Sequence, residues 1–122
     1  MSLDVYLSMT LDVGRPPLRD GSIDLETVEF FSRNITHNLG KMADEAGLYE
    51  ACWRPNENGI MEAKQLIPVL ESGLARLLEG EDYYKQFSPK NGWGNYNVLV
   101  RFVETYLEAC KKYPNAEVSV WR

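Results

Sequence analysis

The fold of this chain is decided by the stretch Leu3–Val13, which reads LDVYLSMTLDV. Leucine, valine and methionine occupy every second position, and mostly polar residues lie between them. Because successive side chains of a β-strand point to opposite faces, this alternation predicts a strand over residues 3–13 with one buried face. Gly14–Pro17 is rich in residues that end a strand, so a turn is predicted there. The apolar face of this strand has to be covered by other parts of the chain.

The rest of the chain supplies two more strands and the helices that cover them. Residues 28–35 contain β-branched and aromatic side chains, and residues 116–121 alternate again, so both are predicted strands. Apolar residues that recur every three or four positions predict three helices, near residues 36–46, 67–79 and 95–112. The second should begin near Pro68, because proline is tolerated in the first turn of a helix and not further inside. This order predicts an α+β fold, with a small, mostly antiparallel three-stranded sheet and helices on one face.

Length, charge and cysteine content narrow the class of protein. The 122 residues fit a single α+β domain, residues 1–122. The net charge is −5 and acidic and basic residues are interspersed, so generic nucleic-acid binding is not expected. Cys52 and Cys110 lie far apart in apolar surroundings, which predicts two reduced core thiols.

No apolar run reaches the ~20 residues of a membrane span. Residues 1–4 do not resemble a signal peptide, so the cytosol is the expected location. The exposed edges of a three-stranded sheet leave a homodimer open.

The first candidate site surrounds the only histidine, His37, which follows the second predicted strand. A helix that begins here would present free backbone N–H groups to an anion. Asn34, Thr36, His37 and Asn38 would add side-chain donors, or His37 would act as a general acid or base. The alternative is structural: Thr36 caps the helix, and His37 and Asn38 lie on an exposed turn.

Two further clusters have side chains that suit ligand binding. Asn91, Trp93 and Tyr96 belong to a glycine-containing loop, where the rings can stack on a flat group and the amide can hydrogen-bond to it. Alternatively, Trp93 folds back and anchors the loop on the core. Trp53 and Arg54 end a short predicted helix, where Arg54 can bind a phosphate or carboxylate. The alternative is that Pro55 simply ends the helix and Trp53 covers the core.

No catalytic, metal-binding or cofactor motif is found in the sequence. It lacks a phosphate-binding loop, a dinucleotide fingerprint and a nucleophile elbow, and one histidine with two distant cysteines does not form a zinc site. We therefore expect no metal, no cofactor and a non-catalytic binding protein for a small polar or anionic, nucleotide-like ligand or for a host protein. The alternatives are a small hydrolase or transferase that acts on a nucleotide-like substrate through His37, and a purely structural protein.

Three motifs carry a resemblance to a known family: Asn34–Ala43 (NITHNLGKMA), the Trp53–Pro55 turn, and Asn91–Gly94 followed by Tyr96. They resemble a family of small uncharacterised proteins encoded by bacteriophages and prophages, and the resemblance runs from the first strand to the end of the chain. It implies a phage accessory or early protein in the cytosol of the bacterial host. It assigns no catalytic residue.

Overall fold

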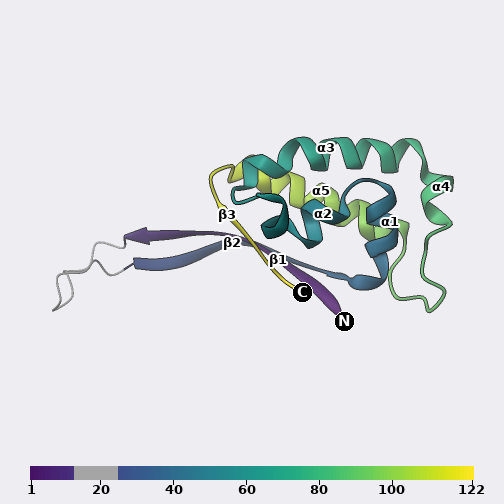
Figure 1. Ribbon diagram of the computed structural model, residues 1–122, viewed down its shortest axis with the longest axis horizontal. Coiled ribbons are helices and arrows are strands. Elements are labelled where there is room, and N and C mark those ends of the chain that lie inside the picture. Colours follow the sequence, from purple (N-terminus) through teal and green to yellow (C-terminus); the bar gives the residue numbers. More distant parts are fainter. Residues whose placement is uncertain (13–24) are drawn as a thin grey trace.

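A three-stranded antiparallel sheet forms one layer of the computed structural model, which describes residues 1–12 and 25–122 (Figure 1). Its strands are β1 (Ser2–Asp12), β2 (Leu25–Thr36) and β3 (Glu117–Trp121), in the order β2-β1-β3. The central strand is therefore the one with the strongest alternation. Val13 and the turn predicted at Gly14–Pro17 lie outside the described residues.

The helices form a second layer on one face of this sheet (Figure 1). In chain order they are η1 (His37–Leu39), α1 (Gly40–Glu45), α2 (Tyr49–Trp53), η2 (Pro55–Asn58), α3 (Ala63–Glu79), α4 (Glu81–Lys85) and α5 (Tyr96–Lys112). The long helices α3 and α5 pack against each other. The predicted α+β architecture is thus confirmed. Among the described residues, no helix is long and apolar enough to cross a membrane.

The core lies between the two layers and follows the alternation of β1. Leu3, Val5 and Leu7 are fully buried, whereas Leu11, on the same face further along, is exposed. The reason is visible in Figure 1, where the β1–β2 hairpin extends well beyond the helices. Only the first half of the alternating stretch is therefore used to build the core.

A bulge in β2 explains why its alternation is weak. The register shifts after Leu7, which pairs with Phe31, because the next residue, Ser8, pairs with Glu29 and leaves Phe30 unpaired. Both phenylalanines consequently stack on tyrosines at α5: Phe30 on Tyr113 and Phe31 on Tyr106.

The start of α3 differs from the prediction. The helix is continuous from Ala63, so Pro68 lies inside it and not at its beginning. The first turn is held from outside the helix: the backbone N–H of Ala63 donates to Ala116 O at 2.9 Å, and that of Lys64 donates to Pro114 O at 2.8 Å. These bonds to the segment before β3 stabilise a turn that proline alone would discourage.

The two cysteines are buried free thiols, as expected. Burial raises the pKa of both Cys52 and Cys110 to about 12. Both thiols are therefore protonated near neutral pH, and a protonated thiol is a poor nucleophile.

Candidate functional site

One pocket joins residues from both halves of the chain. Its volume is about 370 Å³, and it forms where β1 begins, β2 passes into η1, α2 ends and β3 ends. We call it the cationic pocket and define it by its lining residues, which are Met1, His37, Tyr49, Trp53, Arg54 and Arg122. His37, Trp53 and Arg54, which come from two separate sequence clusters, are thus brought together by the fold.

A hydrogen bond between two of these predicted residues defines the state of the histidine. The indole N–H of Trp53 donates to Nδ1 of His37 at 2.9 Å. Nδ1 therefore has its lone pair directed at Trp53, and in the neutral ring the proton is on Nε2. Since Trp53 is buried and its indole N–H donates to His37, the bond holds the imidazole in place. His37 then offers Nε2–H as a hydrogen-bond donor.

Arg54 reaches the pocket from the end of α2. Its Nε donates to the Tyr49 hydroxyl at 3.4 Å, and its Nη1 donates to Glu57 Oε2 at 2.6 Å. The Tyr49 ring in turn stacks on Trp53, with 5.5 Å between the ring centroids. The hydrogen bond and charge of Glu57 raise the pKa of Arg54 further above its usual value, so its positive charge is permanent. Within the described part of the chain, Nη2 of Arg54 has no hydrogen-bond partner.

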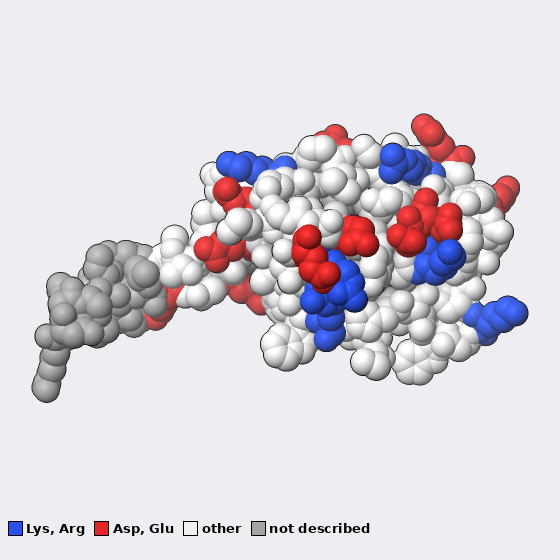
Figure 2. All heavy atoms as spheres, in the orientation of Figure 1, with Lys and Arg blue, Asp and Glu red and all other residues white. Residues whose placement is uncertain are grey.

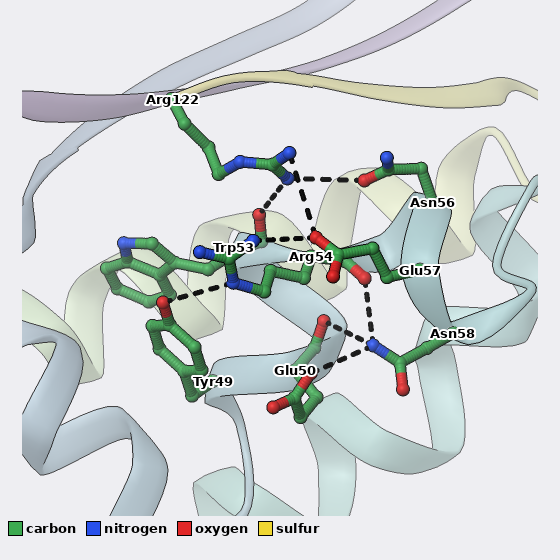
Figure 3. Close-up of polar contacts among 8 residues, drawn as sticks. All are labelled: Tyr49, Glu50, Trp53, Arg54, Asn56, Glu57, Asn58 and Arg122. Atoms are coloured by element: carbon green, nitrogen blue, oxygen red, sulfur yellow. Dashed lines mark hydrogen bonds and ion pairs between the residues drawn. The ribbon is translucent and has the colours of Figure 1, made fainter.

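Sequence reasoning missed three of the pocket residues, Met1, Tyr49 and Arg122, and of these Arg122 brings a charged side chain. Its Nη1 donates to the backbone oxygen of Trp53 at 2.9 Å and to Oδ1 of Asn56 at 3.2 Å. Figure 3 shows its side chain reaching from the end of β3 across to this α2–η2 junction. The one feature of the sequence that could have indicated Arg122 is the alternation of β3. Arg122 follows Val120 by two positions, so its side chain lies on the same face of the sheet. That signal does not indicate which helix lies opposite.

The pocket carries a local positive charge. Arg54 and Arg122 both lie near Glu57, which accepts from Arg54 and is 3.8 Å from Nη2 of Arg122. One carboxylate therefore faces two guanidinium groups, and it is not among the residues that line the pocket. On the face drawn in Figure 2, basic and acidic side chains are interspersed. An excess of guanidinium donors in a small hollow suits a carboxylate or a phosphate.

The backbone donors predicted at the first helical turn are already occupied. The N–H of His37 donates to Met1 O at 3.3 Å, and that of Asn38 donates to the hydroxyl of the capping residue Thr36, also at 3.3 Å. The expected anion site formed by a free helix N-terminus is therefore wrong for these two groups. The donors that face the pocket belong to side chains instead.

The two asparagines beside His37 do not line the pocket. Asn34 lies opposite Asp4 in the sheet, and its amide donates to Asp4 Oδ1 at 2.7 Å and to Ser2 Oγ at 2.8 Å. It thus ties β2 to β1. Asn38 is exposed on the η1 turn.

The predicted loop at residues 91–96 does not bring its aromatic rings to the pocket. Trp93 is 67% exposed, so the expectation that it anchors the loop on the core is wrong. Asn91 accepts a hydrogen bond from the backbone N–H of Trp93 at 2.9 Å and so shapes the loop. Tyr96 is buried and donates to Leu77 O at 2.6 Å, which removes it from the ring-stacking role.

The same loop does approach η1 through its backbone. A Cβ atom added to Gly94, whose φ is +95°, would lie 2.8 Å from Cγ2 of Thr36 and 3.0 Å from Cδ1 of Leu39. Only glycine fits this combination of close approach and backbone angle. The approach of these two segments is therefore a packing contact and not a shared binding site.

Among the described residues, no three histidine, cysteine or acidic side chains come together as metal ligands. Comparison of the chain with protein-family models, with curated proteins and with solved structures finds no match.

Proposed function

We propose that this chain is a non-catalytic binding protein whose ligand places an anionic group, a carboxylate or a phosphate, in the cationic pocket. The observation that carries the proposal is the pair Arg54 and Arg122, which are distant in the sequence and, within the described part of the chain, form ion pairs with one carboxylate only, that of Glu57. The charge that remains is available to a ligand.

The pocket is organised before any ligand arrives. Both guanidinium groups are already held: Arg54 by Glu57 and the Tyr49 hydroxyl, and Arg122 by the Trp53 carbonyl and the Asn56 amide. An entering anion therefore does not need to order these side chains, and preorganisation of this kind lowers the cost of binding. Each hydrogen bond to a charged group contributes about 1.5–3 kcal/mol.

The state of His37 favours binding over acid–base catalysis. A catalytic histidine is usually oriented by a carboxylate or carbonyl at Nδ1, which leaves Nε2 free to take a proton. Here Trp53 donates to Nδ1, so Nε2 of the neutral ring already carries its proton. Such a ring stabilises an anion by donating to it, and it is not set up as a general base.

The phage-type origin and the bacterial cytosol as location are part of this proposal. They rest on the Asn34–Ala43, Trp53–Pro55 and Asn91–Tyr96 motifs. Two of these motifs supply His37, Trp53 and Arg54 to the cationic pocket. The third supplies the Gly94 contact that supports η1.

A titration with simple anions tests the proposal. We would add inorganic phosphate, acetate and adenosine monophosphate separately to the ¹⁵N-labelled full chain and follow its NMR spectrum. We expect the Trp53 indole N–H and the backbone signals of residues 37 and 54 to shift, because these groups lie at the pocket. The double variant Arg54→Gln, Arg122→Gln should lose the shifts while its melting temperature shows that it is still folded.

The matched control is Arg101→Gln, which removes an exposed arginine of α5 outside the pocket and should leave the shifts intact. Absence of shifts with all three anions would reject the proposal. Equal shifts in the double variant would reject this pocket as the site.

A further inference from the structure

The outer edge of β3 is only partly covered. Near its start, the backbone N–H of Val118 donates away from β1, to Met61 O at 2.9 Å, and Glu62 pairs with Glu117. Backbone groups of a strand alternate in direction, so Val120, two residues on, also directs its N–H and C=O away from β1. Within the described residues, no segment pairs with Val120 on that side. Its N–H and C=O are free to pair with another strand.

Space for a further strand exists beside this part of the edge. A hollow of about 520 Å³ lies there, lined by Pro55 and Asn56 on the helix side and by residues 118–122 of the strand. It shares Arg122 with the cationic pocket, so the two hollows adjoin. On the opposite face of the sheet Trp121 is 73% exposed and offers an apolar surface next to the same edge.

We propose that an extended acidic peptide segment of a partner protein adds as a fourth strand to the edge of β3. Its main chain pairs with Val120, and one Asp or Glu side chain enters the cationic pocket beside Arg54 and Arg122. Strand addition supplies main-chain hydrogen bonds, and pockets for alternate side chains supply specificity. This inference rests on the proposed function and names the class of ligand that brings the anionic group.

A peptide fits the edge better than a second copy of this chain. A two-fold axis at Trp121 would pair Val120 with Arg122 of the other copy. That arrangement adds further cationic residues at the pocket and brings no carboxylate to it. An axis at Val120 would pair that residue with its own symmetry mate, and Arg122 would then lie opposite Val118, whose N–H already donates to Met61 and whose side chain carries no carboxylate. The excess charge at the end of the edge requires a partner that carries an acidic residue.

Selection from a random eight-residue peptide display library on the folded full chain tests this inference. We expect enriched sequences that share an Asp or Glu at one fixed position among β-branched residues, which favour strands. A synthetic copy of the best sequence would then be N-methylated at one position at a time. Only alternate positions should lose affinity, by about tenfold or more, because a strand directs every second N–H at its neighbour.

Two protein variants examine the main-chain and charge contacts separately. Val120→Pro removes the outward N–H and should abolish peptide binding while the phosphate-induced NMR shifts persist; edge strands tolerate proline. Its matched control, Val120→Thr, keeps the N–H and should bind. The double variant Arg54→Gln, Arg122→Gln should no longer select for the acidic position.

Three results would overturn the inference: no enriched sequence, enriched sequences without a fixed acidic position, or N-methylation effects that do not alternate. A dimer that forms with rising concentration in sedimentation and is lost in Val120→Pro would assign the edge to a second copy instead. If phosphate and acetate bind but no peptide does, only this inference fails. If the simple anions also fail to bind, the proposed function fails as well.

Discussion

Replacing Trp53 with phenylalanine tests the hydrogen bond that organises the cationic pocket. The change keeps an aromatic ring against Tyr49 and Phe102 but removes the indole N–H that donates to His37. Two carbon atoms leave a fully buried position, at about 0.8 kcal/mol each. The lost hydrogen bond adds about 1 kcal/mol. We therefore expect the free energy of unfolding to fall by about 2.5 kcal/mol.

Urea denaturation followed by circular dichroism measures this loss, and a double-mutant cycle with His37→Ala isolates the bond. The coupling energy between the two positions should be about 0.5–1.5 kcal/mol. In the wild type, the ¹⁵N NMR spectrum of the imidazole should show a protonated Nε2 and an unprotonated Nδ1.

A coupling energy indistinguishable from zero would refute the bond as a stabilising interaction, whatever Trp53→Phe costs by itself. An imidazole protonated at Nδ1 in the neutral ring would refute the orientation of His37 and, with it, the argument against acid–base catalysis.

Three further predictions concern the core and the helices. Cys52 and Cys110, whose pKa values burial raises to about 12, should not react with a thiol reagent such as DTNB at pH 8 in the native protein and should both react in denaturant. Gly73→Ala should lower the stability by about 1–3 kcal/mol, because the added Cβ would lie 2.2 Å from Cδ2 of Leu48 and overpack the contact. Pro68→Ala should raise the stability by about 1–2 kcal/mol, since alanine restores a backbone donor in α3 while the unfolded chain gains freedom.

For each of these predictions, a control variant or a contradicting result can be named. Ser72→Ala, one position before Gly73 and exposed, should be neutral or stabilising, and a higher melting temperature for Gly73→Ala would contradict the overpacking argument. Rapid labelling of the native thiols would contradict their burial. An unchanged or lower urea midpoint for Pro68→Ala would mean that the turn before Pro68 depends on the proline.

The strands show how much of the fold the local pattern of apolar residues predicts. Leu3, Val5 and Leu7 alternate because one face of β1 is covered, and that pattern predicted the strand and its buried face. Residues 28–35 gave a weaker signal because the bulge at Phe30 places two neighbouring aromatic residues on one face, which no period of two describes.

The candidate site, too, was predicted only in part from the sequence. His37, Trp53 and Arg54 could be selected for their chemistry, and they do line one pocket. Trp93 and Tyr96 were selected for the same kind of reason, yet one is exposed and the other is buried against α3. Residue type indicates what a side chain can do, and it does not indicate where that side chain points.

The sequence by itself determined the three strands, the main helices and the α+β class, because each follows from the period of apolar residues along a short stretch. The apolar surroundings of the two cysteines likewise indicated that their thiols are buried. Only the tertiary structure decided that α3 runs through Pro68, since bonds from the 114–116 segment hold its first turn. It alone decided that Arg122 meets Arg54, because β3 returns beside β1 and ends next to α2. Such contacts join residues that are distant in the chain, and local periodicity carries no information about them.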